Sequence, residues 1–561
     1  TMFKKTDPNP QLDIFTAPLM QLGSRASKKY SDPNAWYNQF YSLVTTKIDE
    51  EIFKPLFPEG KKSGRPNASI RILVAMSALK EGFGCSDEDL FEKCEFDLLT
   101  RKALGMELLT DVTPSIDTYY LFRRRICEYQ ERTGIDLMQL CFEQLAGNQV
   151  RLLKISGKCV RMDSKLIGSN IARQSRYELI HTTLVKFLKT CTLSNLSPEK
   201  EELAKEYLKE DSSKTVYRSD SDTLQSNLAR IGNFIMEMLA TFPATSPAHD
   251  LLQRLFDEQY AVKDGKAVLR DKKEVKADSL QNPNDPDATY RAKNDQKVQG
   301  YVTNITETVE EGKPNIITSV QVETAVFADC HFLQEAVENS ERVTDSTIED
   351  LYADGAYQSP DNREFAKNHN AMQLKTGKMQ GGCRWELIPH DEDGLTVREI
   401  ATGNTYEAVK AVTKQGSRKR WRIPWNNKTG WRYFEDKDIK AYQLRKQIES
   451  LPLEEQHKRN NVEAAMFQYS FHTRKGKTRY RGLLKHRMHA YSRCMWMNLR
   501  RMVIFQISTF QRSIFALFGP IREAFGSFKA ISRKIFTSGA DCYVSLRMTT
   551  LARLDSKYVP F

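Results

Sequence analysis

The sequence predicts an α/β protein with an all-α N-terminal part, and three observations support this fold class. Residues 35–147 repeat apolar side chains at the three- and four-residue spacing of helices. Short apolar runs at 158–163, 300–306, 316–325 and 351–353 are typical of strands, and helical segments separate them. The 561 residues are 40% hydrophobic and 28% charged, which excludes a mainly disordered chain.

Differences in composition divide the chain into four parts. The third part is interrupted twice. The first interruption is a charged helical stretch at 170–262 followed by a polar loop at 263–298, and the second consists of short strands that alternate with glycine turns. We therefore expect a flexible arm at 1–34, a helical domain at 35–147, an α/β domain at 148–505 and a basic helical tail at 506–561, with a helical and loop insertion at 170–298 and a small antiparallel β insertion at 380–435.

Helix signals mark the N-terminal domain. Apolar residues recur from Ile70 to Leu79 at helical spacing, and Ser86 is a good N-cap with Asp89 at the capping-box position. A later predicted helix carries Arg123 and Arg124 on its polar face. DNA backbone contacts and ordinary surface charge explain these arginines equally well.

Two aspartates directly follow strand-like runs in the α/β domain. Asp163 ends the run at 158–163, and Asp354 follows the run at 351–353. The end of a strand is a rigid place for a carboxylate, although an aspartate there is more often a turn former or a helix cap than a metal ligand.

A third carboxylate stands alone in a basic segment. The segment from Lys458 to Arg501, with both ends included, contains twelve Lys or Arg residues, and Glu463 is its only acid. It could form a helical surface ion pair with Arg459 or complete a metal site. The whole chain carries a formal charge of +12 with pI near 9.0, which favours a polyanionic partner.

Several carboxylates together suit hard divalent cations. Mg²⁺ prefers oxygen ligands, and two ions about 3.5–4 Å apart can hold the attacking and leaving oxygens of a phosphodiester. No Gly-x-Ser-x-Gly motif occurs, so a serine hydrolase fits the sequence less well.

The order of the motifs from about residue 35 to 505 resembles bacterial insertion-sequence transposases of the DDE class, whose catalytic domain has the ribonuclease-H-like, retroviral-integrase-type fold. The matching segments are Gly64 to Pro66, Ile70 to Leu79, Gly84 to Asp87, Ala103 to Gly105, Met162 to Ser164, Gly168 to Ile171, Gly300 and Tyr301, Asp329, Ala353 to Ser359, Arg459 to Glu463, Arg479 to Leu483 and Asn498 to Arg501.

This resemblance implies that Asp163, Asp354 and Glu463 form a catalytic, metal-binding triad for two Mg²⁺ ions, with Mn²⁺ as a substitute. It implies cleavage at the ends of an insertion sequence, strand transfer into target DNA, a DNA-binding role for the helical domain and a homodimer on DNA. We expect DNA contacts from Arg459, Arg474, Lys475, Lys477, Arg479, Arg481, Lys485, Arg123 and Arg124.

Glu449 is a competing choice for the third acid. The spacing of Tyr442, Arg445 and Glu449 matches the Tyr-x-x-Arg-x-x-x-Glu signature of related transposases, whereas Gln456 occupies the tyrosine position before Glu463. We prefer Glu463, because Arg479 to Gly482 stand at the family distance from it.

The resemblance also implies that the β insertion can help handle a flipped base. Its tryptophans, Trp385, Trp421, Trp425 and Trp431, could serve this role, but we favour a small core of their own. We expect the histidines of the basic segment, His472, His486 and His489, to be phosphate neighbours or solvated residues rather than metal ligands.

Two rival functions remain open: an inactive DNA-binding descendant of a transposase, and a nuclease of the same fold that cuts without joining. The cysteines include no Cys-x-x-Cys pair, the N-terminus has no signal-peptide core, and no membrane span is predicted. These features favour the cytoplasm, with nucleoid association when the protein is bound to DNA.

Overall fold

A computed structural model describes residues 3–6, 17–57, 66–244, 246–293, 296–376, 383–390, 394–411, 420–425, 430–450, 452, 455, 458 and 462–524. It divides into two compact units. The first comprises residues 1–157, 164–346 and 465–561, and the second comprises residues 158–163 and 347–464.

The first unit begins with the helical N-terminal part. As expected, Ser86 and Asp89 form a capping box, which satisfies backbone N–H groups at the start of α5. The predicted arm at 1–34 contains two short helices. The elements are α1 (Pro18–Gln21), α2 (Ser24–Tyr30), α3 (Trp36–Leu43), η1 (Thr45–Lys47), η2 (Glu50–Leu56), α4 (Ile70–Phe83), α5 (Asp87–Phe96), α6 (Leu98–Leu104), α7 (Ile116–Thr133) and α8 (Leu137–Leu153).

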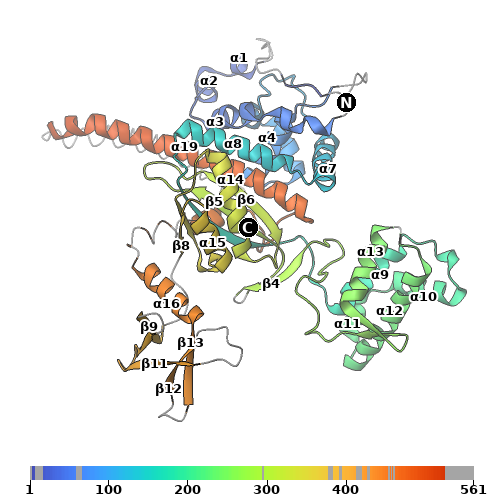
Figure 1. Cartoon of the computed structure of the whole chain (residues 1–561). Helices are drawn as coiled ribbons and strands as arrows, with labels where there is room; N and C mark the ends of the chain where they lie inside the picture. Colours follow the sequence, from blue (N-terminus) through green and yellow to red (C-terminus); the bar gives the residue numbers. More distant parts are fainter. Residues whose placement is uncertain are drawn as a thin grey trace. The chain divides into compact units, whose positions relative to one another are not determined.

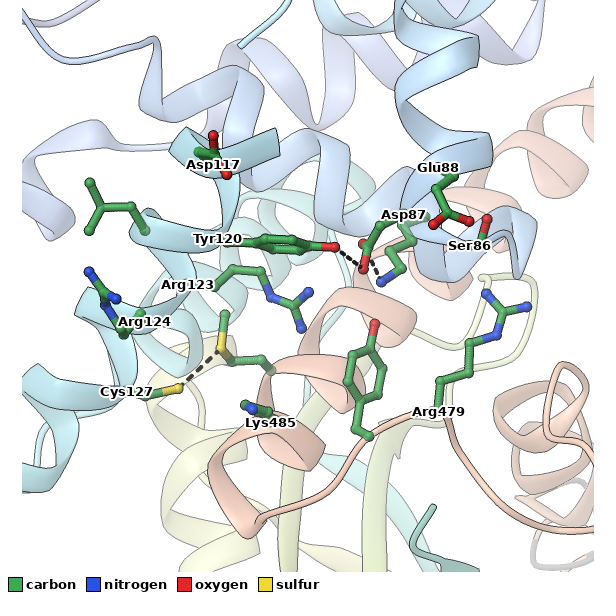
Figure 2. A pocket seen from close by; sticks show the side chains of 14 residues that line it. Ser86, Asp87, Glu88, Asp117, Tyr120, Arg123, Arg124, Cys127, Arg479 and Lys485 are labelled. Carbon is green, nitrogen blue, oxygen red and sulfur yellow. Dashed lines mark hydrogen bonds and ion pairs between the residues drawn. The ribbon is translucent and has the colours of Figure 1, made fainter. Parts of the chain in front are cut away.

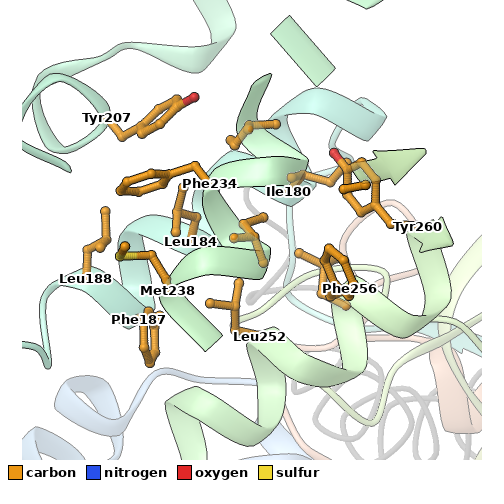
Figure 3. Packing of buried hydrophobic residues seen from close by; sticks show 14 of the residues in the cluster. Ile180, Leu184, Phe187, Leu188, Tyr207, Phe234, Met238, Leu252, Phe256 and Tyr260 are labelled. Atoms are coloured by element: carbon orange, nitrogen blue, oxygen red, sulfur yellow. The ribbon is translucent and has the colours of Figure 1, made fainter. Parts of the chain in front are cut away.

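The helical insertion has a hydrophobic core of its own, in which Leu184, Phe234 and Leu252 are buried (Figure 3). The prediction of a loop at 263–298 is wrong, because this range includes β3, β4 and the start of β5. Asp264 and Gly265 both have positive φ and form the turn of the hairpin between β2 and β3. An Asp-Gly pair is typical of such turns, so the sequence indicated this hairpin. The elements are α9 (Arg176–Leu188), η3 (Leu193–Asn195), α10 (Pro198–Lys209), α11 (Ser212–Arg218), α12 (Ser221–Thr241), α13 (Pro247–Gln259), β2 (Tyr260–Lys263) and β3 (Lys266–Leu269).

A mixed sheet follows the insertion. Strand β5 pairs antiparallel with β4 through its first residues and with β6 through its later residues. Helix α14 joins the N-terminal helices through Arg342, which binds both carboxylate oxygens of Glu143 on α8 at 2.9 Å. The elements are β4 (Thr289–Lys293), β5 (Gln296–Thr308), β6 (Ile317–Thr324), η4 (Asp329–Phe332) and α14 (Leu333–Thr344).

Helix α19 (Leu483–Ala524) is the longest element described and packs on α4, α8 and β6 (Figure 1). Trp496 lies 5.5 Å from Phe83 and 6.0 Å from Trp36 between ring centroids. A Cβ at Gly82 would overlap the Trp496 ring, so glycine permits this close approach. The helix continues through residue 506, where we expected a separate tail to begin.

The second unit contains parallel strands. Strand β1 (Cys159–Gly168) pairs with β7 (Asp350–Ala353), and β7 pairs with β8 (Gln373–Thr376). Helix η5 (Gly355–Tyr357) and α15 (Pro360–Asn368) connect β7 to β8. Within the second unit the strands therefore follow the order β1-β7-β8, and within the first unit β5 lies between β4 and β6.

The β insertion is a five-stranded antiparallel sheet in the order β13-β12-β11-β10-β9. One face packs on Ile439 of the following helix, and the insertion thereby forms a separate small core. The elements are β9 (Trp385–His390), β10 (Gly394–Glu399), β11 (Thr405–Ala411), β12 (Arg420–Trp425), β13 (Gly430–Glu435) and α16 (Asp436–Glu449), and α18 (Val462–Ser470) follows.

The fold class is therefore mixed α/β, with a curled mixed sheet and many helices. The predicted strands near 300–306, 316–325 and 351–353 are confirmed as β5, β6 and β7. Among the described helices, none is long and apolar enough to cross a membrane.

Candidate functional site

Asp163 lies inside β1, which continues to Gly168 and does not end at residue 163 as predicted, and Asp354 directly follows β7. Arg161 on β1 is in register with Tyr352 on β7. Asp163 and Asp354 each stand two residues further along, so continuing the register places them at the same level. Side chains two residues apart point to the same face of a sheet. Both aspartates are half-buried.

Asp354 also shapes the turn that follows its strand. Its backbone is extended, and its side chain accepts a hydrogen bond of 2.7 Å from the backbone N–H of Gly355. The aspartate therefore caps helix η5, which is the common structural role of an aspartate at a strand end. This contact uses one of the two carboxylate oxygens of Asp354.

Glu463 lies in the first turn of α18, where it is exposed. It belongs to the same unit as Asp163 and Asp354. Within the described part of the chain, no three His, Cys, Asp or Glu side chains gather closely enough to hold a metal ion. The metal-binding role of the three acids stays a prediction. The competing acid, Glu449, is the exposed last residue of α16.

Four of the predicted DNA-binding residues come together around a cavity of about 910 Å³ in the first unit (Figure 2). Arg123 and Arg124 come from α7, Lys485 comes from α19, and Arg479 comes from the loop before α19. Acidic side chains also line the cavity, so its wall carries both signs of charge. They are Asp87, Glu88 and Asp117.

Two of these four cations have internal partners. The Arg479 guanidinium donates to the backbone carbonyl oxygens of Gly84 and Cys85. Arg123 lies between the rings of Tyr119 and Tyr480, at 5.4 and 5.2 Å from their centroids. Both arginines therefore hold α4 and α7 against the C-terminal segment, a role that their sequence pattern did not indicate.

The other two cations are directed to solvent. Arg124 is exposed and lies 3.5 Å from Glu128 in a surface ion pair, which contributes little to stability. Lys485 is also exposed.

Four more of the residues predicted to contact DNA lie in the loop between α18 and α19. Two of them donate hydrogen bonds to backbone carbonyl oxygens. Lys477 donates to the carbonyl of Ile171 at 2.7 Å, and Arg481 donates to that of Asn170 at 2.7 Å. Arg474 and Lys475 are exposed, and Lys475 has the positive φ of a tight turn. Arg459 lies outside the described residues.

The histidine prediction is wrong for His486 and His489, which are buried at 2% and 8% exposure. His489 Nδ1 lies 2.7 Å from a carboxylate oxygen of Glu81 on α4. Burial acts to raise the pKa of Glu81, but His489, Lys80 and a hydrogen bond from Tyr480 outweigh it and hold this pKa well below its usual range. Glu81 of α4 is the partner of His489, and Thr478 and Tyr480 of the preceding loop are the partners of His486. These partners stabilise the two histidines inside the protein.

The tryptophans of the β insertion divide between a core and a surface. Trp385 and Trp421 are buried in the core of the insertion, as we favoured. Trp431 is 49% exposed, and the Arg422 guanidinium lies 4.2 Å from its ring centroid. The Trp425 side chain lies outside what the structure describes.

Residues 28–125 match a family model described as Transposase domain (DUF772). This match supports a transposase family and covers most of the helical N-terminal part. No curated protein and no solved structure matches the chain.

Proposed function

We propose that the protein is a DNA transposase of the DDE class, with a ribonuclease-H-like catalytic domain that cleaves the ends of an insertion sequence and joins them to target DNA. The observation that carries this proposal is the parallel pairing of Arg161 on β1 with Tyr352 on β7, because Asp163 and Asp354 each stand two residues beyond this pair. The transposase match over residues 28–125 supports it independently, because that segment contains neither aspartate.

The aspartate pair fits part of the expected metal site. Two carboxylates at the same level of a sheet provide the oxygen ligands that Mg²⁺ and Mn²⁺ prefer. Asp163 and Asp354 would hold the ions, and Glu463 would have to approach them from α18, because the described residues do not gather three acids. Two bound ions would supply activation of the attacking oxygen and stabilisation of the leaving 3′-oxygen.

The solvent-directed cations would bind the DNA backbone. Arg124, Lys485, Arg474 and Lys475 have exposed side chains and suit phosphate contacts. We propose that the helical N-terminal part uses such contacts to bind terminal repeats. A homodimer would hold two element ends together, and the protein would act in the cytoplasm at the nucleoid.

One observation favours a second candidate, an inactive descendant that binds DNA without cutting it. Glu463 is exposed, and the three acids do not form a metal-binding group among the described residues. A nuclease that cuts without joining is the third candidate, since it would use the same aspartates.

The test is a strand-transfer assay with the full chain, Mg²⁺ and end-labelled duplexes taken from the DNA that flanks this coding sequence. Cleavage with joining supports the transposase, cleavage alone supports the nuclease, and binding alone supports the inactive descendant. Glu463→Gln should abolish cleavage, and Glu449→Gln should behave as wild type. The reverse pattern would assign the third acid to Glu449.

A further inference from the structure

Glu455 makes contacts with several side chains in the second unit. One carboxylate oxygen lies 2.7 Å from the Lys458 ammonium, and the other lies 3.0 Å from the Lys375 ammonium. The Tyr352 hydroxyl donates to the second oxygen as well. Lys375 also binds Asp350 at 2.9 Å, so the two ammonium groups balance two carboxylates.

These contacts tie the segment around Glu455 to both strands that carry the aspartates. Tyr352 stands on β7 two residues before Asp354. Arg161 stands on β1 two residues before Asp163, is 2% exposed, and donates to the carbonyl oxygen of Lys458 at 2.8 Å. Glu455 is therefore attached to β7, and Lys458 is attached to β1.

The same contacts make Glu455 unsuitable as a metal ligand. Both of its oxygens already bind cationic partners, and two lysines beside a carboxylate oppose a further cation. Hydrogen bonds from Lys458 and Tyr352 lower the pKa of Glu455 to about 2, despite its partial burial, so the group is charged at neutral pH. Glu455 therefore serves to attach its part of the chain to Tyr352 and Lys375. The next acid along the chain, Glu463, remains available as a metal ligand.

We infer that Glu455 is a positioning residue, which fixes the segment leading to Glu463 against the strands that carry Asp163 and Asp354. This inference rests on the proposed function, in which Glu463 must reach the two aspartates. A ligand on a loosely held segment loses freedom when it binds, and this loss weakens metal binding. Attachment eight residues earlier reduces that cost.

The first test does not depend on activity. Trypsin cuts after Lys458 and Arg459, and mass spectrometry can measure the rate of cleavage there in the folded full chain. Glu455→Gln should accelerate this cleavage severalfold, because it removes the charge that holds Lys458 and Lys375. Glu449→Gln is the matched control, since Glu449 is exposed at the end of α16, and it should leave the rate unchanged.

The second test measures the Mg²⁺ requirement of DNA cleavage. The Mg²⁺ concentration for half-maximal rate should rise about tenfold in Glu455→Gln, the usual scale for losing a group that orients metal ligands. The rate at saturating Mg²⁺ and the DNA affinity should stay within a few fold of wild type. Tyr352→Phe removes only a hydroxyl and should shift both measurements in the same direction by less, so it replaces Glu455→Gln if that variant misfolds.

Two results overturn the inference: unchanged tryptic cleavage, or faster cleavage without a change in Mg²⁺ requirement. If the wild-type protein shows no Mg²⁺-dependent cleavage of DNA, the proposed function fails. The tryptic rate alone then decides whether Glu455 holds the segment.

Discussion

At the scale of single residues, several cations and histidines that the sequence predicted to lie near DNA phosphates make contacts within the protein. Arg479 and His486 lie in a strongly basic segment, where exposure is the ordinary expectation; His486 is buried there, and Arg479 is exposed but hydrogen-bonded within the protein. Their partners are carbonyl oxygens and aromatic rings from distant parts of the chain. A His486 ring centroid 4.1 Å from that of Tyr301 is one such contact.

His486 gives a pH-dependent prediction. Burial, followed by the charge of His489, lowers the pKa of His486 from 6.5 to about 3. The unfolded chain therefore takes up a proton below pH 6.5 that the folded protein does not bind, and stability falls as the pH decreases from 6.5 toward 3. The contribution of one proton is at most about 1.4 kcal/mol per pH unit.

Urea unfolding at pH 6 and pH 5 measures this effect, since Glu81 takes up its proton only at lower pH. His486→Gln should lose less stability between these two conditions than wild type. Equal losses in both proteins would contradict the buried, neutral His486.

Arg479 and Lys475 give a paired prediction. Arg479→Ala removes two hydrogen bonds to Gly84 and Cys85 at the end of α4, and we expect a loss of about 1–3 kcal/mol in the free energy of unfolding. Lys475→Ala should leave the free energy of unfolding unchanged and weaken DNA binding. The slope of log affinity against log salt concentration should fall in magnitude by about 1, the value for one lost phosphate contact. Denaturant unfolding and salt-dependent binding assays check the pair. An Arg479→Ala protein with wild-type stability would show that the contacts of Arg479 with Gly84 and Cys85 are not needed for folding stability.

At the scale of secondary structure elements, local signals predicted much of the fold. The capping box at Ser86 and the apolar runs that became β5, β6 and β7 are local patterns, so one segment suffices to predict each. Strand β4 was not predicted from the sequence, because its residues, Thr289–Lys293, are mostly polar and pair with the equally polar start of β5. Strand pairing at a sheet edge depends on the partner more than on hydrophobic alternation.

The β insertion provides a prediction at this scale. Trp421 is 4% exposed in the core of the insertion, whereas Trp431 is 49% exposed on its surface. Trp421→Ala should destabilise the insertion by about 3–5 kcal/mol, the usual cost of removing a buried tryptophan. Trp431→Ala should cost about 1 kcal/mol or less, chiefly its contact with Arg422. Limited proteolysis within 383–435 measures both, and equal sensitivity would contradict this division of roles.

At the scale of the whole molecule, the sequence predicted the site only in part. Asp354 directly follows β7, as its apolar run predicted, whereas Asp163 lies inside β1, which continues to Gly168. Each stands two residues beyond the paired residues Arg161 and Tyr352, and their catalytic role stays a prediction. Glu455 and Lys458, which precede Glu463 in the sequence, are contacted by Arg161, Tyr352 and Lys375 from distant parts of the chain. Sequence spacing does not encode such a long-range attachment.

The most direct test of the aspartate pair compares three variants in the DNA cleavage assay with Mg²⁺. Asp361 is an exposed carboxylate in the first turn of α15, in the same unit, and Asp361→Asn is the matched control. Asp163→Asn and Asp354→Asn should each abolish cleavage while DNA affinity stays within a few fold, and Asp361→Asn should cleave as wild type. Cleavage retained by either Asp163→Asn or Asp354→Asn would contradict the account.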